Sequence, residues 1–281
     1  MSYHISSNKF TNPLLKELLK TLTIYFNSID THFYIIGATA RDIIFSVVHD
    51  QESGRKTFDL DIAIAIPDWN DFEKISAELT STGNFKKSTE EKQKFFFKDV
   101  YELDIVPFGE IAKEDQNIYW PPEEDHAMSV RGFTEIAKNT LSLIVDKEFT
   151  IQVATLPGIF FLKIIAWKDR NHRTGKDAED ISFIIESYLE IYRNNLQEEN
   201  YDIYEDDNYN EYNAGAILIG RDLKKLFTGK KEIETEVIKI LENELKKEET
   251  SILIYQIIKS NPILQYEQIH RALTSTIREL R

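Results

Sequence analysis

The sequence contains no cysteine among its 281 residues. Disulfide bonds, thiolate metal sites and thiol catalysis are therefore excluded, and we expect a cytoplasmic location. Long apolar runs are also missing, since no stretch approaches the ~20 residues needed to span a bilayer. The N-terminal residues lack a basic segment followed by an apolar core. We therefore expect neither a signal peptide nor a membrane partner.

Basic residues are in the minority. The chain carries 34 Lys and Arg against 48 Asp and Glu, which gives a formal net charge of -14. Proteins that coat nucleic acid are usually basic, so a polyanion would have to bind here through a local basic groove or bridging metal ions. The six histidines show no close spacing of zinc ligands, and the G-x-S-x-G turn of many serine hydrolases is absent.

The composition is otherwise that of a globular protein, with 42% hydrophobic and 29% charged residues. Apolar spacing in the first half predicts helices and strands in alternation. The predicted helices cover residues 12–29, 38–49 and 68–83. The predicted strands cover residues 33–36, 57–67, 94–100 and 101–108, the last ended by Pro107, and a hairpin over 140–146 and 149–155.

After Pro157 every periodic segment has helical spacing, including the last twenty residues. We therefore expect an α+β fold in two domains. Residues 1–155 would form a domain with a mixed sheet flanked by helices. Residues 156–281 would form an all-helical domain. The acidic, tyrosine-rich residues 198–212 are interpreted as a solvated loop.

Carboxylates occupy one face of the predicted strand 57–67. Asp59 and Asp61 alternate with large apolar residues, so they share a face with two alanines. Asp104 likewise lies in the predicted strand 101–108 on the face opposite its apolar residues. A lone D-x-D can line a solvated sheet face. Three aspartates on two strands, where Asp is disfavoured, indicate a function instead.

Convergence of these three carboxylates requires a cation or a proton. Two like charges about 4 Å apart repel by roughly 4 kcal/mol at an effective dielectric constant near 20. Carboxylate oxygens without His or Cys nearby suit Mg²⁺ or Mn²⁺. Two such ions held by shared carboxylates are the apparatus for in-line phosphoryl or nucleotidyl transfer.

The stretch "FYIIGATARDIIF", residues 33–45, predicts a strand, a tight turn and a helix. Gly37 permits a positive φ or a close backbone approach. The amides of Ala38, Thr39 and Ala40 would open the helix, where free N–H groups and the dipole favour an anion such as a triphosphate. The turn can equally be a plain connection.

Together these motifs resemble the nucleotidyltransferase superfamily that includes DNA polymerase beta and the CCA-adding enzymes. "GATARDII" followed by "GRKTFDLDIAI" is similar to the CCA-adding form. The segment "LPGIFFLKIIAWKDRNHRTGKDAEDI" makes the AbiEii/AbiGii-type nucleotidyltransferases the closer match, many of which are toxins of toxin–antitoxin or phage-defence systems. Ala38 departs from the Ser or Gly of many relatives, and the gap from Gly37 to Asp59 is longer than in the simplest members.

The resemblance implies a role for each matching residue. The metal ions would be bound by Asp59, Asp61 and Asp104, and Asp104 could also act as base toward the acceptor hydroxyl. The nucleotide phosphates would be held by Gly37, Ala38, Thr39, Arg41, Lys163 and Lys168. The catalytic set would comprise Asp59, Asp61, Asp104, Lys163 and Asp177. The resemblance also implies that residues 1–155 are the catalytic domain and that the helical residues 156–281 complete the nucleotide and acceptor cleft.

Two basic clusters stand out in this acidic chain. The first consists of Arg170, His172, Arg173 and Lys176, and the second of Lys86, Lys87, Lys92, Lys94 and Lys98. Each is a candidate for binding phosphates or RNA, although a solvated surface explains either one.

The sequence therefore predicts a Mg²⁺- or Mn²⁺-dependent nucleotidyltransferase. It would move NMP from an NTP to a hydroxyl of RNA, tRNA included, or of a protein. As a toxin it would have an antitoxin as a further partner. Two alternatives stay open: a small-molecule acceptor, as in antibiotic-modifying nucleotidyltransferases, and a catalytically silent relative that only binds.

Overall fold

The computed structural model describes all residues except 1, 11, 52–58, 125–126, 193–199 and 206–208. The chain divides into two compact units, Met1–Thr155 and Leu156–Arg281. The N-terminal unit combines sheet and helices, and the described part of the second unit contains helices and no strand. Within the described ranges, no helix has both the length and the apolar character needed to cross a membrane.

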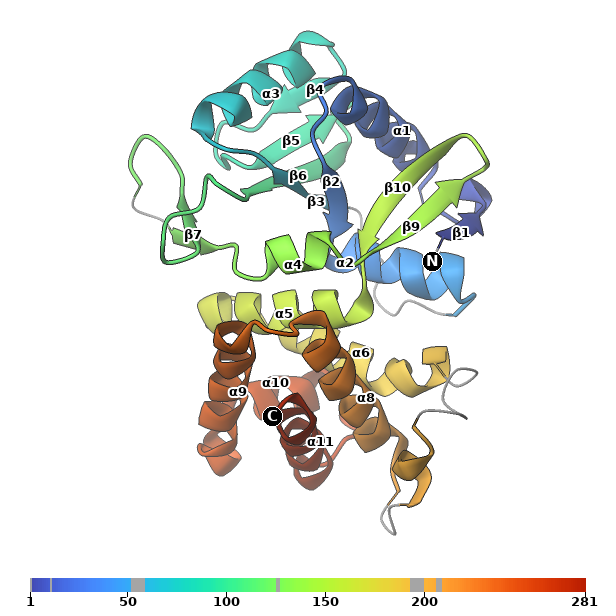
Figure 1. Ribbon diagram of the computed structural model, residues 1–281, viewed down its shortest axis with the longest axis vertical. Coiled ribbons are helices and arrows are strands. Elements are labelled where there is room, and N and C mark those ends of the chain that lie inside the picture. The colour runs from blue at the N-terminus through green and yellow to red at the C-terminus, as the bar shows by residue number, and fades with distance from the viewer. Residues whose placement is uncertain (1, 11, 52–58, 125–126, 193–199, 206–208) are drawn as a thin grey trace. The chain divides into compact units, whose positions relative to one another are not determined.

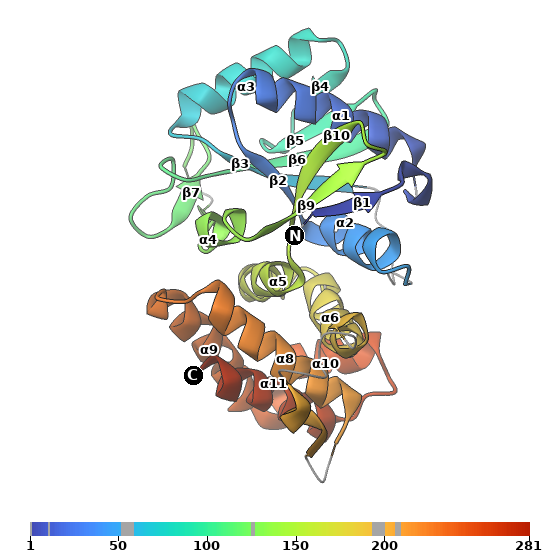
Figure 2. The same ribbon diagram turned by 45° about the vertical axis from the view of Figure 1, so that its right-hand side comes forward.

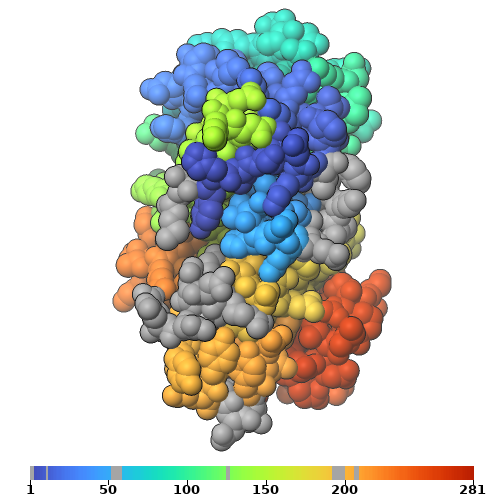
Figure 3. Space-filling view, turned by 90° about the vertical axis from the view of Figure 1, so that its right-hand side faces the viewer, coloured from blue at the N-terminus to red at the C-terminus, as the bar shows by residue number. Residues whose placement is uncertain are grey.

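An eight-stranded sheet forms the centre of the N-terminal unit (Figure 1). Its order is β1-β9-β10-β2-β3-β6-β5-β4. The strands are β1 (Ser2–Ile5), β2 (Phe33–Ile36), β3 (Asp59–Ala65), β4 (Phe85–Lys87), β5 (Lys94–Phe97), β6 (Tyr101–Phe108), β9 (Thr140–Val145) and β10 (Phe149–Ala154). The sheet contains both parallel and antiparallel pairs, so the predicted mixed sheet is confirmed. Figure 3 shows β1 beside the β9–β10 hairpin at the surface.

Two long helices cover one face of this sheet, as Figure 2 shows. They are α1 (Pro13–Ser28) and α3 (Trp69–Ser81). Asn12 and Asp68 cap them, because each side chain accepts a hydrogen bond from a backbone N–H of the first turn. The ring of Phe26 on α1 lies 5.0 Å from that of Phe33 on β2, on the apolar side of the sheet.

The opposite face of the sheet has two different halves. At one end, the small Ala63 leaves room for aromatic side chains: the Tyr34 ring lies 5.7 Å from the Phe108 ring, and Tyr34 donates a hydrogen bond to the Phe133 carbonyl. Phe133 begins the short helix α4 (Phe133–Ala137), which lies after the small β7–β8 pair (Asn117–Tyr119 and Ala127–Ser129). At the other end of β3 are the aspartates. That second half of the face therefore carries negative charge.

Strand β2 leads directly into α2 (Gly37–Asp42), which continues as a π-helix over Ile43–Val48. The predicted helix over 38–49 is therefore helical throughout, with a wider second half. Gly37 has φ +70°, a conformation that side-chain-bearing residues rarely adopt. The strand, turn and helix of "FYIIGATARDIIF" are confirmed.

The α-helices in the described part of the second unit are α5 (Leu156–Arg170), α6 (Lys176–Tyr192), α8 (Glu211–Leu226), α9 (Lys231–Leu245), α10 (Ile252–Ser260) and α11 (Tyr266–Leu280). The sequence predicted all of these helices except α10. Helix α8 packs closely on its neighbours at two glycines. A Cβ at Gly215 would overlap the Ile185 carbonyl of α6, and one at Gly220 would lie 2.8 Å from the Thr276 carbonyl of α11.

The acidic segment is only partly the solvated loop that the sequence predicted. Residues 198–199 and 206–208 lie outside the described residues. Between them, Tyr201–Glu205 forms a 3-10 helix. Asp202 of this helix accepts a hydrogen bond of 2.9 Å from Arg221 on α8, which fixes it to the helical unit.

Candidate active site

Three aspartates of the N-terminal unit share one face of the sheet and one end of it. Asp61 on β3 is the register partner of Asp104 on β6, and Asp59 is the partner of Glu102. Neighbours in register point to the same side, so these carboxylates lie on the charged half of the face. Asp61 is also paired with Ile36, the last residue of β2. The carboxylates are thus gathered where β2 turns into α2.

The pKa of the Asp104 carboxyl group is strongly perturbed. Burial, with the negative charges of Glu91, Asp59 and Glu102 added, raises the pKa of Asp104 to about 6, against the opposing charge of Lys94. Its Oδ1 atom is buried and has no hydrogen-bond partner among the described residues. Buried polar atoms nearly always have a partner, so this oxygen is a natural ligand for a cation.

The donor set suits a hard divalent cation, because it consists of carboxylates alone. Within the described residues, however, no three His, Asp or Glu side chains already form a ligand cluster. The fit of Mg²⁺ or Mn²⁺ rests on the donor chemistry and on the unpartnered Asp104 oxygen. Metal binding by Asp59, Asp61 and Asp104 stays a prediction.

Gly37 lies directly against Asp61. A Cβ at position 37 would overlap Oδ2 of Asp61 and would lie 2.9 Å from its Cγ and 3.1 Å from its Cβ. Any side chain at this position would therefore have to displace the carboxylate. The sequence predicted Gly37 as part of a phosphate cradle and gave no sign of this contact.

Thr39 is 3% exposed, and its hydroxyl donates a hydrogen bond of 2.5 Å to the backbone carbonyl of Asp59. The sequence predicted this hydroxyl as a donor to a triphosphate, but in the structure it connects α2 to β3. Ala38, between Gly37 and Thr39, is buried as well. Nucleotide binding by these three residues stays a prediction.

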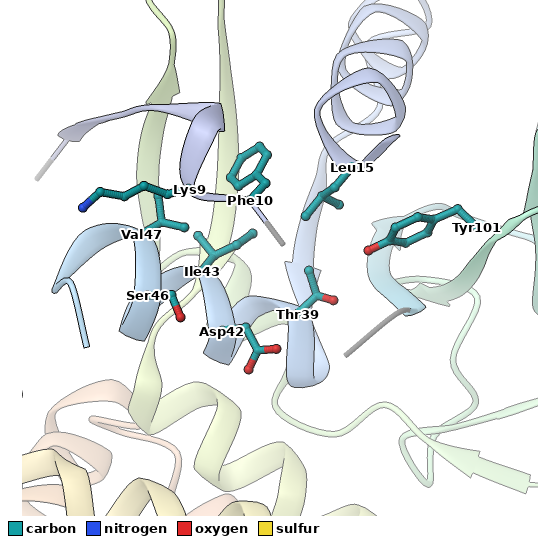
Figure 4. Close-up of a pocket in the computed structure, with 9 residues that line it drawn as sticks. All are labelled: Lys9, Phe10, Leu15, Thr39, Asp42, Ile43, Ser46, Val47 and Tyr101. Carbon is teal, nitrogen blue, oxygen red and sulfur yellow. The ribbon is translucent and has the colours of Figure 1, made fainter. Parts of the chain in front are cut away.

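Tyr101 was not predicted as part of the site. Alternation assigned it to the apolar face of its strand, yet burial and then the charge of Asp59 raise its pKa to about 12. Tyr101 also lines a small pocket beside the turn (Figure 4). The pocket is lined by Lys9, Phe10, Leu15, Thr39, Asp42, Ile43, Ser46, Val47 and Tyr101. Its polar groups come from Thr39, Asp42, Ser46 and Tyr101.

Arg41 is 1% exposed and forms an ion pair with the neighbouring Asp42. Its Nε and Nη2 donate hydrogen bonds of 3.0 and 2.7 Å to Oδ1 of Asp42. A nucleotide phosphate would have to compete with this carboxylate for the guanidinium. The predicted role of Arg41 in nucleotide binding therefore has an intramolecular competitor that the sequence did not reveal.

In the helical unit, Lys163 and Asp177 belong to one buried ion-pair network. The Lys163 Nζ atom lies 3.2 Å from Oδ1 of Asp177 and 2.6 Å from Oδ2 of Asp180. Arg170 holds Asp177 from the other side through hydrogen bonds of 2.7 and 2.8 Å. Burial would raise the pKa of Asp177, but the hydrogen bonds from Arg170 and the charge of Lys163 outweigh it and lower that pKa. Asp180 was not in the predicted set.

The remaining basic residues are largely paired. Lys168 lies 2.9 Å from Glu236. In the second basic cluster, four lysines have carboxylate partners: Lys87 with Glu73, Lys92 with Glu123, Lys94 with Glu91 and Glu102, and Lys98 with Glu17. These pairs neutralise much of the positive charge that a count of lysines implied. Binding of RNA or protein through the clusters stays a prediction.

Comparison with known proteins gives one family and several distant folds. The model of the family "Nucleotidyl transferase AbiEii toxin, Type IV TA system" matches residues 18–260. No curated protein matches the chain. Among solved structures, an antigenic nucleotidyltransferase-like protein from Paracoccidioides brasiliensis has 16% identity and a TM-score of 0.43, over 72% of this chain and 93% of that one.

Two further solved structures are similar at lower scores. The antibiotic-resistance factor ANT(2'')-Ia has 13% identity and a TM-score of 0.35, over 69% of this chain and 97% of that one. The CCA-adding enzyme of Thermotoga maritima, complexed with tRNA, has 13% identity and a TM-score of 0.34, over 96% of this chain and 81% of that one. Scores of this size carry no argument about activity.

Proposed function

The chain belongs to the AbiEii family of nucleotidyltransferase toxins, and from this premise we propose that it transfers NMP from an NTP to a hydroxyl of RNA, tRNA included, or of a protein. The family membership confirms the predicted resemblance and the enzyme class, a nucleotidyltransferase. The metal, the acceptor and the antitoxin belong to the proposal. So does the predicted cytoplasmic location.

The observation that carries the proposal is the pairing of Asp61 with Asp104 in neighbouring strands, with an Asp104 oxygen that is buried and unpartnered among the described residues. Keeping a carboxylate in this state costs free energy. A bound cation would recover that cost. The aspartates are thus arranged as expected for a protein that binds a divalent ion on this face.

The proposed residues divide the reaction between them. Asp59, Asp61 and Asp104 would hold Mg²⁺ or Mn²⁺, which when bound neutralises charge on the triphosphate. The acceptor oxygen attacks the α-phosphorus, the bond to the β-phosphate oxygen breaks, and pyrophosphate leaves. Asp104 is the candidate to take the proton of the acceptor hydroxyl. Lys163, Lys168 and Arg41 remain proposed phosphate contacts, each in competition with its carboxylate partner.

The test is a labelling experiment with each α-labelled NTP, Mg²⁺ or Mn²⁺, and a mixture of cellular RNA and protein. We expect one or more nucleotides to label a band that ribonuclease or protease removes, which identifies the acceptor class. Label confined to small molecules would replace the macromolecular acceptor by the small-molecule alternative. Absence of label with all four nucleotides and both ions would overturn the proposal.

The toxin role has its own test. Expression of the wild-type chain should arrest growth, and Asp59→Ala should relieve the arrest because transfer is lost. Asp99→Asn is the matched control, since Asp99 lies in the turn before β6 with φ +57° that Asn tolerates. Harmless expression of the wild-type chain would remove the toxin role while leaving the transferase proposal standing.

A further inference from the structure

We infer that Gly37 and Thr39 are positioning residues that hold the aspartate strand in place, and we call this pair of contacts the brace. Gly37 admits the Asp61 carboxylate, and Thr39 anchors the backbone of Asp59. Only the role of these aspartates in metal binding rests on the proposed function. The geometry of the brace involves only side chains and backbone of this chain.

The Gly37 half of the brace is steric. Asp61 occupies the space that a side chain at position 37 would fill, with Cγ at 2.9 Å from the site of a Cβ. Contacts below 3.0 Å require something to move, and here the moving group is the carboxylate itself. Gly37 therefore determines where Asp61 points, whether or not a phosphate approaches the turn.

Gly83 provides a matched comparison within the same unit. Its φ of +73° nearly equals the +70° of Gly37, but nothing lies within 4 Å of the position that its Cβ would take. Alanine at either site carries the same backbone strain of about 1 kcal/mol. Only at position 37 does the methyl group meet an aspartate.

The Thr39 half of the brace is a hydrogen bond. A hydroxyl carries a single proton, so Thr39 cannot donate to a phosphate while it donates to the Asp59 carbonyl at 2.5 Å. The side chain is 3% exposed, which also keeps it from solvent. This bond joins residues twenty positions apart and connects the first turn of α2 to the first residue of β3.

A phosphate cradle and a brace predict different effects of substitutions at positions 37 and 39 on nucleotide binding and on cation binding. If the turn acts only on the triphosphate, changes at positions 37 and 39 weaken nucleotide binding and leave the aspartates alone. If the turn is a brace, the same changes move Asp59 and Asp61 and weaken cation binding before any nucleotide is added.

The first experiment compares Gly37→Ala with Gly83→Ala in metal-free protein labelled with ¹³C at the aspartate carboxyls, with Asp61→Asn to assign the resonance. We expect Gly37→Ala to shift the Asp61 signal and Gly83→Ala to leave it in place. Mn²⁺ titration followed by electron paramagnetic resonance should show about 10-fold to 100-fold weaker binding for Gly37→Ala alone, as for residues that orient metal ligands.

The second experiment compares Thr39→Val, Thr39→Ser and Thr23→Val. Thr23 is also buried, and its hydroxyl has no partner among the described residues, so its valine variant removes a hydroxyl without removing a bond. We expect Thr39→Val to shift the Asp59 carbonyl resonance and to weaken Mn²⁺ binding about 10-fold. Thr39→Ser should keep the Asp59 carbonyl resonance and the Mn²⁺ affinity near their wild-type values, because the donor is kept. Thr23→Val should change neither quantity.

An unchanged Asp61 signal in Gly37→Ala, or an unchanged Asp59 signal in Thr39→Val, overturns the brace. So does a loss confined to nucleotide affinity. Failure of the proposed function looks different, because it is an absence of labelling by the wild-type protein. The carboxyl and carbonyl resonances decide the brace even if the wild-type protein binds no Mn²⁺.

Discussion

Two groups of aspartates in this molecule have opposite surroundings. In the helical unit, Asp177 and Asp180 are almost completely buried and meet Lys163 and Arg170 at 2.6–3.2 Å. In the N-terminal unit, Asp104 is paired in register with another aspartate and has a buried oxygen with no hydrogen-bond partner in the described part of the chain. The pKa of Asp177 is lowered, whereas that of Asp104 is raised.

The difference indicates two uses for the same side chain. A buried carboxylate held by cations of its own protein is stabilised when charged, and removal of one partner is costly. The Asp104 carboxyl keeps a raised pKa despite the nearby charge of Lys94, so its charged form is unfavourable until a ligand arrives, which is typical of functional sites. The helical network should therefore govern stability, and the sheet aspartates should govern activity.

The sharpest test of this division is Asp104→Asn. We expect the rate of nucleotidyl transfer to fall at least about 100-fold to 1,000-fold, because a charge at the reacting centre is lost. The free energy of unfolding should stay the same or rise, since an unfavourable buried carboxylate is removed. Initial labelling rates and urea unfolding measure the two effects, with Asp99→Asn as control. A variant that is less stable than the wild type but fully active would contradict the assignment of Asp104 to activity.

In the helical unit, Lys163→Met should lower the free energy of unfolding by about 3–5 kcal/mol. The methionine fills similar space but leaves Asp180 buried without the ammonium that lies 2.6 Å away. Urea denaturation followed by helix content measures the change. Lys163 is also a proposed phosphate contact, so nucleotide binding cannot serve as the control. The control is Mn²⁺ affinity, which should not change. Wild-type stability in this variant would show that the network is not structural.

Acidification should weaken the same network. The folded pKa of Asp177 is lowered from 3.8, so its stabilisation is present above that value and is lost as the pH falls through the depressed pKa. Thermal unfolding of the wild-type protein and Asp177→Asn should therefore differ most at neutral pH and converge below about pH 4. A difference that is constant from pH 7 to pH 3 would exclude Asp177 as the titrating group.

The smallest stability effect is expected for Lys168→Ala. Lys168 is half exposed, and its pair with Glu236 should contribute less than about 1 kcal/mol. This variant separates the predicted nucleotide contact from structure. A raised KM for the NTP at unchanged stability would support the contact, and an unchanged KM would remove Lys168 from the site.

Local pattern was sufficient to predict β2, β3, β5, β6, β9 and β10, whereas the short strands β1, β4, β7 and β8 were missed. Alternation along residues 57–67 placed Asp59 and Asp61 opposite the apolar core, and β3 pairs with β6 so that Asp104 lies on the same face. The spacing of apolar residues and the residue types in turns involve positions close in sequence, so they can be recognised in a single sequence. Residues 57 and 58 of that predicted strand lie outside the described residues.

Partners that are distant in sequence could not be predicted. The Thr39 hydroxyl meets a carbonyl twenty residues away, and Lys98 meets Glu17 at a separation of 81 residues. A count of nearby lysines therefore overestimated the free positive charge. Only the fold brings the neutralising carboxylates close.

The predicted strand 101–108 has the bounds of β6, so Pro107, expected to end this strand, is its last residue but one. Strand β6 continues to Phe108, with Pro107 opposite Ile64 of β3. Ile105 donates its N–H toward the β5 side, to Gln93, and position 107 faces the same side beyond the last β5 register pair at Lys94. The proline lacks an N–H where no strand is there to accept one. Strand order decides this, and the order is not visible in the sequence.

The two outer strands of the sheet have a consequence for handling the protein at high concentration. β1 and β4 are four and three residues long, so each edge offers few backbone groups to another chain. Short edge strands are a known protection against edge-to-edge aggregation. Trimming Ser2–Ile5 would expose the six residues of β9 as a new edge. Such a shortened chain should form fibres or precipitate sooner than the intact one.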